Sequence, residues 1–250
     1  MNISLEPEAI FHLGGFPFTN SFIMTLVVSV VIIGISFFVQ KNMVLVPRGF
    51  QNIFEALIEY FYGLVDSVTQ NREETKKFFP LVMTIFIFVI LSNWVELLPG
   101  LGTIGVNGMK AGQSVLIPFI RSGSADLNTT LALALISVFA IHFMGISSLG
   151  PLKYANKFLV NPFKKPYFIG SFVGILELIG EVAKIISFSF RLFGNIFAGE
   201  VLLLVMLTLA PYIVPLPFLM LEIFVGFVQA LVFAMLTLVF LKTAVTVTEH

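Results

Sequence analysis

Charged and amide side chains recur on one face of a long apolar stretch near the C-terminal end of the sequence. Together with Phe188 they step by three or four residues, so on a helix they form one stripe: Glu177, Glu181, Lys184, Phe188, Arg191 and Asn195, with Ser187 beside it. A guanidinium keeps its charge at any biological pH and is costly at bilayer depth. Arg191 therefore indicates a transport or proton-relay site with a partner charge nearby. The alternative is an arginine that reaches a lipid headgroup or closes an internal salt bridge.

The composition identifies the class of protein that surrounds this stripe. Of 250 residues, 58% are hydrophobic and only 11% are charged, whereas about a quarter of the residues of a soluble domain are charged. The chain is therefore predicted to be a polytopic membrane protein. It contains no cysteine and only three scattered histidines, so we expect no disulfide, no metal site and no cofactor.

Five apolar runs are long enough to cross a bilayer. They cover residues 21–39, 78–98, 127–146, 167–209 and 217–245, after an outer N-terminal segment at 1–20. The run at 167–209 would measure about 60 Å as a helix, twice the hydrocarbon thickness of about 30 Å, and contains no proline that would turn it. The predicted fold is one all-α membrane domain, 1–250, whose last two helices form a long, strongly tilted antiparallel hairpin.

Residues 50–66 have a different pattern, with apolar side chains at helical spacing on one face and polar side chains on the other. This pattern predicts an amphipathic helix on the cytoplasmic side, in the membrane interface. It does not distinguish that position from packing under the other helices or against a partner subunit.

The distribution of basic residues between the loops predicts the orientation. One side of the membrane carries ten of them: Lys41, Arg48, Arg72, Lys76, Lys77, Lys153, Lys157, Lys164, Lys165 and Lys242. The other side carries Lys110 and Arg121 only. By the positive-inside rule the N-terminus lies outside and the C-terminus in the cytoplasm, which an odd number of spans allows.

Further polar residues lie where the last two helices would face each other. In an antiparallel hairpin, Glu222 lies at the depth of Glu200, and Gln229 at the depth of Arg191. Glu96 and Asp126 add carboxylates on the outer side, while Glu177 and Glu181 lie on the cytoplasmic side. A fixed cation between two groups of carboxylates would block a direct path, so a proton would have to leave the chain on a moving partner that has its own protonatable group.

Four segments carry a resemblance to a known family. Arg191-Leu192-Phe193-Gly194-Asn195, followed by Ala198-Gly199-Glu200, resembles the signature of subunit a of F-type ATP synthases. The supporting matches are Glu96-Leu97-Leu98-Pro99, Ser124-Ala125-Asp126-Leu127-Asn128, and Gln229-Ala230 with Phe233. The agreement runs from about residue 40 to the C-terminus, so the resemblance predicts a proton-channel subunit of such a complex.

The resemblance also implies roles for individual residues. Arg191 would face the ring of c subunits, attract its carboxylates and prevent a proton short circuit. Its polar neighbours would be Asn195 and Gln229. The outer path would use Glu200 and Glu222, with Glu96, Asp126 and Asn128 near its mouth, and the cytoplasmic path would use Glu177, Lys184, Ser187 and Glu181.

The implied partners are the c-subunit ring, the subunit b peripheral stalk, other ATP synthase subunits, the lipid bilayer and the transported H⁺. The sequence has no phosphate-binding glycine loop, so we expect nucleotide chemistry to occur on other subunits, and we expect no nucleic-acid partner. Mitochondrial relatives carry histidine in place of Glu200 and some bacterial relatives in place of Glu222. The two glutamates therefore favour a bacterial inner-membrane protein, in which they would share a proton.

Several of these residues also have ordinary structural interpretations. Gln229 could form an interhelical hydrogen bond, Glu181 and Lys184 a local ion pair, and His142 a packing contact in the third run. A secondary transporter is less favoured, because the two halves of the chain show no inverted repeat and the prolines lie at the ends of the runs.

Overall fold

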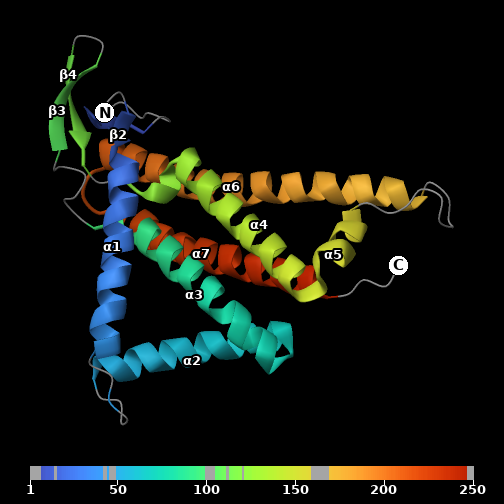
Figure 1. Ribbon diagram of the computed structural model, residues 1–250. Helices are drawn as coiled ribbons and strands as arrows, with labels where there is room; N and C mark the ends of the chain where they lie inside the picture. The colour runs from blue at the N-terminus through green and yellow to red at the C-terminus, as the bar shows by residue number, and fades with distance from the viewer. Residues whose placement is uncertain are drawn as a thin grey trace.

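The computed structural model describes residues 7–13, 16–41, 44, 49–98, 105–110, 113–119, 121–158 and 169–246. Within these ranges the chain is mainly helical, which confirms the predicted all-α class (Figure 1). The helices are α1 (Asn20–Lys41), α2 (Phe50–Thr69), α3 (Arg72–Val95), α4 (Leu127–Leu149), α5 (Pro151–Phe158), α6 (Ile169–Leu209) and α7 (Pro215–Val245).

Five of these helices, α1, α3, α4, α6 and α7, are long and apolar enough to cross a membrane. They coincide with the five predicted runs, so the chain is a multi-pass membrane protein. Residues 167 and 168 of the fourth predicted run lie outside the described residues. α6 has 41 residues and α7 has 31, whereas about 20 suffice for an upright crossing.

α3 is displaced from the predicted run at 78–98. It begins at Arg72 because the side chain of Asn71 accepts a hydrogen bond from the Glu73 backbone N–H, and Glu73 and Glu74 occupy its first turn. A prediction based on hydropathy alone leaves these polar residues out of the membrane span. The helix ends at Val95, so Glu96 lies just beyond its last turn.

Two β-hairpins were not predicted. β1 (Ala9–Leu13) pairs with β2 (Phe16–Thr19), and β3 (Gly105–Lys110) pairs with β4 (Gln113–Pro118), both antiparallel. Figure 1 shows both hairpins at the end of α1 that is nearer the N-terminus. Each strand has only four to six residues, too few for a clear alternation of apolar and polar side chains.

α2 crosses the opposite end of α1, transverse to it (Figure 1). It contains the predicted amphipathic segment 50–66 and extends to Thr69. Phe61 of α2 is buried against Phe86 of α3, with their ring centroids 4.2 Å apart. At the corner between the two helices, the Thr75 hydroxyl donates to Asp66 at 2.8 Å. The second half of the apolar face of α2 therefore packs against α3, whereas Ile53 and Leu57 of the first half are exposed.

α3 is attached to α7 along most of its length. The Asn93 amide donates to the backbone oxygen of Gly226, and the Trp94 indole N–H to that of Ile223, both at 3.0 Å. At the other end of the contact, Lys242 forms a 2.6 Å ion pair with Glu74. These contacts hold α7 along α3, so its polar residues have a defined position.

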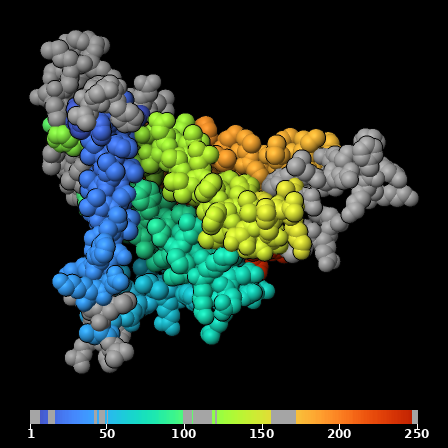
Figure 2. Space-filling view, viewed as in Figure 1, coloured from blue at the N-terminus to red at the C-terminus, as the bar shows by residue number. Residues whose placement is uncertain are grey.

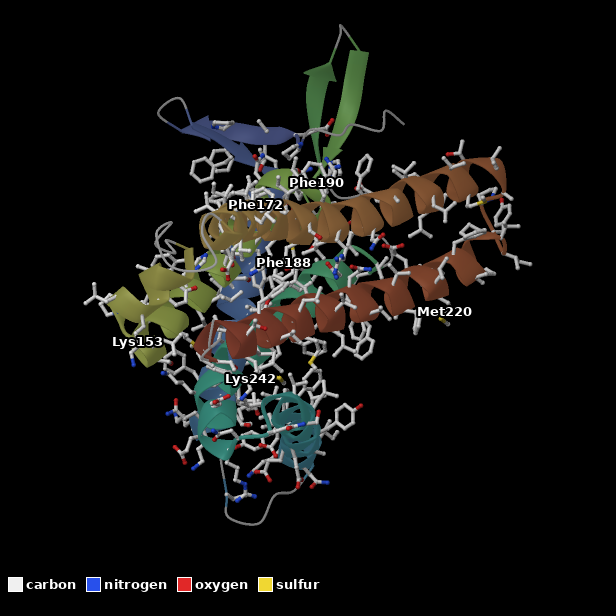
Figure 3. The ribbon with its side chains drawn as sticks, turned by 90° about the vertical axis from the view of Figure 1, so that its right-hand side faces the viewer. Lys153, Phe172, Phe188, Phe190, Met220 and Lys242 are labelled. Carbon is white, nitrogen blue, oxygen red and sulfur yellow. The ribbon has the colours of Figure 1, made fainter. Side chains whose placement is uncertain are left out.

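α6 and α7 pack against each other in antiparallel directions. Phe188 of α6 contacts Phe233 and Phe240 of α7, at centroid separations of 5.0 and 5.7 Å. Figure 3 shows Phe188 between the two helices, and Phe190, which is exposed, elsewhere on α6. In Figure 1 both helices run transverse to α1. Their tilt relative to a bilayer stays a prediction.

α4 crosses α6 on the other side and is followed directly by the short α5. The hydroxyls of Thr130 in α4 and Ser189 in α6 are 3.1 Å apart in the buried contact. Figure 2 shows α4 and α5 as one continuous surface on this face of the molecule. The middle of α6 is therefore held between α4 and α7, and its remaining side is open.

Candidate functional site

Arg191 lies on this open side of α6. The neighbouring exposed positions on the same side carry small or polar side chains, and we call them together the arginine face: Ser187, Arg191, Gly194, Asn195 and Ala198. A Cβ atom at Gly194 would meet no other atom within 4 Å. The arginine face therefore has only short side chains around Arg191, and the exposed Phe190 lies at its edge, one turn from Gly194.

The guanidinium of Arg191 has one close polar neighbour on its own helix. Its Nη2 donates to the Ser187 hydroxyl at 3.2 Å, one turn earlier. Among the described residues, no carboxylate lies within ion-pair distance of Arg191, and no hydrogen bond joins it to Asn195 or Gln229. The charge is thus available to a group outside the chain.

One group of ionisable residues gathers about two turns beyond Arg191, at the end of α6 near the β-hairpins. We call it the Glu200 cluster: Glu96, Arg121, Glu200 and Glu222. Arg121 forms a 3.4 Å ion pair with Glu200, and their side chains are 7% and 20% exposed. Because Arg121 is almost fully buried, its charge needs this partner.

Glu96 joins the Glu200 cluster from the end of α3. Its carboxylate accepts a 3.0 Å hydrogen bond from the Ser122 backbone N–H. Burial, with the nearby Glu200 carboxylate as the second cause, raises the pKa of Glu96 to about 8. Glu96 therefore holds a proton at neutral pH while Glu200 is paired with Arg121.

Glu222 reaches the cluster from α7. Its carboxyl group occupies the space beside Gly199, where a Cβ atom would overlap it. Gly199 directly precedes Glu200, so the two glutamates lie at the same level of the hairpin, as the sequence predicts. Glycine at position 199 is what allows the buried carboxyl to approach the α6 backbone.

Asp126 and Asn128 are near this end of the molecule but have structural partners. The buried Asp126 carboxylate accepts from the Ser21 hydroxyl at 2.8 Å and from the Asn128 backbone N–H at 2.9 Å. It is the N-cap of α4 and fastens α1 to it. The Asn128 side chain is exposed. Their predicted place at a channel mouth stays a prediction.

A second group lies about two turns before Arg191, where α4, α5 and α6 meet. We call it the Glu181 cluster: His142, Tyr154, Glu181 and Lys184. Lys184 pairs with Glu181 at 2.7 Å, which confirms the pairing predicted from their spacing, and it also lies 4.5 Å from the centre of the Phe240 ring. Glu177 is one turn further along α6, half-buried.

His142 belongs to this cluster through both nitrogens of its ring. Nδ1 is 2.7 Å from the Tyr154 hydroxyl, and Nε2 is 3.5 Å from the Glu181 carboxylate. The sequence predicts a packing histidine here. The structure agrees that it is satisfied but adds two ionisable partners that sequence spacing does not bring together.

The two clusters lie on opposite sides of Arg191 along one helix. Lys184 precedes Arg191 by seven positions, about 10 Å along the helix. Glu200 follows Arg191 by nine positions, about 13 Å. The structure therefore brings together Glu96, Glu200 and Glu222 at one end and Glu181 and Lys184 at the other. Gln229 of α7 is partly buried and belongs to neither cluster.

Three members of the clusters were not predicted as site residues: Arg121, Tyr154 and His142, which was predicted only as a packing residue. Arg121 entered the sequence analysis only as a loop charge. The sequence could have indicated its role, since Arg121 is one of only two basic residues on the outer side, which carries several carboxylates at membrane depth. Tyr154 had no signal in the sequence. Among the described residues, no group of histidines and carboxylates could hold a metal ion.

Comparison with known proteins gives one family over nearly the whole chain. The family model described as ATP synthase A chain matches residues 22–242. ATP synthase subunit a of Campylobacter curvus is 34% identical over 249 residues, which cover 100% of this chain and 99% of that protein. The corresponding subunit of Campylobacter hominis is 39% identical over 213 residues, covering 85% and 83%. That of Moorella thermoacetica is 29% identical over 242 residues, covering 96% and 97%. The chain therefore belongs to the ATP synthase subunit a family.

Proposed function

We propose that this chain is the stationary proton-channel subunit of an F-type ATP synthase. It supplies two offset half-channels that carry protons to and from the carboxylates of a rotating c ring, and so couples proton flow to ring rotation and ATP synthesis. The nucleotide chemistry takes place on other subunits.

The observation that supports this proposal best is the position of Arg191. An exposed guanidinium in an apolar, membrane-length helix is costly unless an anion lies opposite it. The arginine face offers small neighbours on both sides of it, so another helix can approach closely. A ring carboxylate that has lost its proton is the anion we assign to this place.

The Glu200 cluster supports an entry path on the outer side. Glu96 carries a proton at neutral pH, and Glu200 and Glu222 lie at the same level of the hairpin, so a proton can be passed between neighbouring oxygens. Arg121, which lies 3.4 Å from the Glu200 carboxylate, holds that side chain in place beside the path. Asn195 and Gln229 lie between this cluster and Arg191 in the proposal, and Asp126 and Asn128 near the mouth.

The Glu181 cluster supports an exit path on the cytoplasmic side, with Glu177, Glu181, Lys184 and Ser187 along α6. The fixed charge of Arg191 stands between the two paths and repels a proton that would cross directly. A proton must then travel on the ring from one path to the other. Each proton that crosses 100 mV delivers about 2.3 kcal/mol, so several must pass for each ATP.

The same proposal implies how the chain is oriented in the membrane and which subunits lie beside it. The N-terminus lies outside and the C-terminus in the cytoplasm of a bacterial inner membrane, since the basic loops face inward. α6 and α7 lie steeply tilted along the c ring, because both exceed the length of an upright crossing. A peripheral stalk of subunit b holds the chain against the turning ring.

Arg191→Ala in the complete complex, reconstituted into vesicles, tests the proposal. We expect ATP-driven proton pumping to be lost, and a passive proton leak through this chain to appear, because the barrier between the half-channels is gone. Lys76→Ala is the matched control, since Lys76 is an exposed cation paired only with the exposed Glu73. Pumping at an unchanged rate in Arg191→Ala would overturn the proposal.

A second experiment addresses the entry path. If Glu200 and Glu222 share a transferable proton, replacing either with Gln slows ATP-driven pumping, because an amide neither accepts nor releases that proton. If both variants pump at the unchanged rate, Glu200 and Glu222 do not share a transferable proton. The proposed role of Arg191 would be unaffected by that result.

A further inference from the structure

We propose that His142 is a proton-transfer residue of the cytoplasmic half-channel and that Tyr154 both orients it and passes protons to it. This inference rests on the proposed function and adds to it a relay group that lies on α4, outside the α6 stripe. The argument starts from the contacts of the Glu181 cluster.

Three helices contribute to one line of polar atoms. It runs from the Tyr154 hydroxyl on α5 to His142 Nδ1 on α4, at 2.7 Å. From His142 Nε2 it continues to Glu181 Oε2 on α6, at 3.5 Å. The other oxygen of Glu181 accepts from Lys184. An imidazole with a partner on each nitrogen can take up a proton on one side and release one on the other.

The turn between α4 and α5 is built to place Tyr154 there. Gly150 ends α4 with a φ of +84°, a conformation that favours glycine, and its backbone oxygen accepts from the Tyr154 N–H. The Tyr154 ring then lies over Gly145, where a Cβ atom would overlap it. Tyr154 is 6% exposed as a result, whereas the adjacent Lys153 points outward (Figure 3).

This environment keeps the Tyr154 hydroxyl protonated. Burial, followed by the negative charges of Glu181 and Glu177, raises the pKa of Tyr154 to about 12. The hydroxyl can therefore donate to Nδ1 of a neutral His142, which places the remaining ring proton on Nε2, toward Glu181. Tyr154 thus selects the tautomer that faces the carboxylate.

The other charges near His142 are already engaged. On α6, Lys184 is paired with Glu181, and Glu177 is the next carboxylate along the helix. On α7, Lys242 is paired with Glu74 of α3. The Lys77 ammonium of α3 donates to Ser148, at the end of α4, at 3.4 Å. Glu181 is therefore the carboxylate to which His142 can deliver a proton.

The transfer conserves protons and charge. During uptake from the cytoplasm, the Tyr154 O–H bond breaks as Nδ1–H forms, and the Nε2–H bond breaks as a new O–H forms on Glu181. A hydronium ion on the cytoplasmic side gives its proton to the Tyr154 oxygen in the same concerted event and leaves as water, so no tyrosinate persists and the net result is one proton moved from the cytoplasm to Glu181. During release, each bond forms and breaks in the opposite order.

His142→Gln tests the inference in the whole complex, reconstituted so that the cytoplasmic face meets the medium. The readout is the initial rate of ATP-driven pumping per assembled complex at medium pH values across the range in which imidazoles change charge, about pH 5 to 8. We expect at least a tenfold decrease, because positioned acid–base groups typically contribute about 100-fold or more. We also expect the pH dependence across this range to flatten.

Two further variants separate relay from packing. Tyr154→Phe keeps the ring over Gly145 and removes the hydroxyl that passes the proton to Nδ1, so it should lower the rate as His142→Gln does and alter the pH profile. Ser148→Ala removes only the contact with Lys77 at the end of α4 and should leave both rate and profile unchanged.

An unchanged profile in His142→Gln, with at most less assembled complex, would assign His142 a structural role and overturn the inference. If His142→Gln does not assemble, an unchanged profile in Tyr154→Phe overturns it. Arg191→Ala in the same assay separates the two proposals: if that variant pumps, the proposed function fails. If it does not pump while His142→Gln behaves normally, only the role of His142 fails.

Discussion

The carboxyl group of Glu222 lies against the α6 backbone at Gly199, in the space that a Cβ atom of residue 199 would fill. The closest contact between α6 and α7 at this level is therefore made by an ionisable group, and it depends on the absence of one methyl group.

Gly199→Ala should force Glu222 or the whole of α7 away from α6. Overpacking of this kind costs about 1–3 kcal/mol, and it would also separate Glu222 from Glu200. We expect a lower thermal stability of the purified complex and slower ATP-driven pumping. Gly180→Ala is the control, because a Cβ there meets no atom within 4 Å. Equal behaviour of the two variants would contradict the close approach at Gly199.

Arg121→Met should destabilise the complex by leaving Glu200 without its cation. We expect a loss of about 3 kcal/mol, the lower end of the range for a broken buried pair, because Glu200 is still 20% exposed. Arg121→Lys should recover part of it. Lys76→Ala, which breaks the exposed pair with Glu73, should cost no more than about 0.5 kcal/mol. Thermal unfolding of the three variants in detergent measures the difference.

The stability of the protein should depend on pH through Glu96. Its pKa rises from 4.5 to about 8 on folding, so the folded state binds a proton that the unfolded chain has released. This contribution is complete below about pH 4.5 and is lost as the pH rises toward 8. Thermal unfolding between these values should show stability falling with pH, and Glu96→Gln should flatten the curve. A slope that persists in Glu96→Gln would assign it to another group.

Asp126 can be tested for a structural or a proton-carrying role. Asp126→Ala removes the N-cap of α4 and the acceptor of the Ser21 hydroxyl, and a lost cap costs about 1–2 kcal/mol. Asp126→Asn keeps a capping oxygen but cannot carry a proton. Normal pumping in Asp126→Asn with reduced stability in Asp126→Ala would assign a structural role, whereas slow pumping in Asp126→Asn would place it on the proton path.

The helical part of the fold could be predicted because hydrophobic length is nearly sufficient to define a membrane helix. Each of the five apolar runs became a long helix, whereas polar ends such as Arg72–Thr75, stabilised by the Asn71 cap, and the short helix α5 were missed. The short strands of β3 and β4 could not be predicted, because their pairing depends on contacts rather than on a periodic pattern.

The candidate site was predictable to the extent that it lies on one helix. The spacing of Glu177, Glu181, Lys184 and Arg191 gives their common face directly. Arg121, His142 and Tyr154 join the clusters from other elements, and their contacts depend on how α4, α5 and the segment before η2 (Gly123–Ala125) fold back. A single sequence indicates how deep such residues lie in the membrane, but not which side chains they contact.

The arginine face also has a mechanical consequence. Helices that pack through interlocking ridges and grooves resist sliding, because side chains must climb past one another. Ser187, Gly194, Asn195 and Ala198 form almost no ridge, so a neighbouring helix that moves across them meets one long polar side chain, Arg191, with Phe190 at the edge of the surface. Resistance to sliding at this contact would be set by the formation and release of one ion pair rather than by collisions between side chains. Such a surface allows a neighbouring helix to move across it repeatedly.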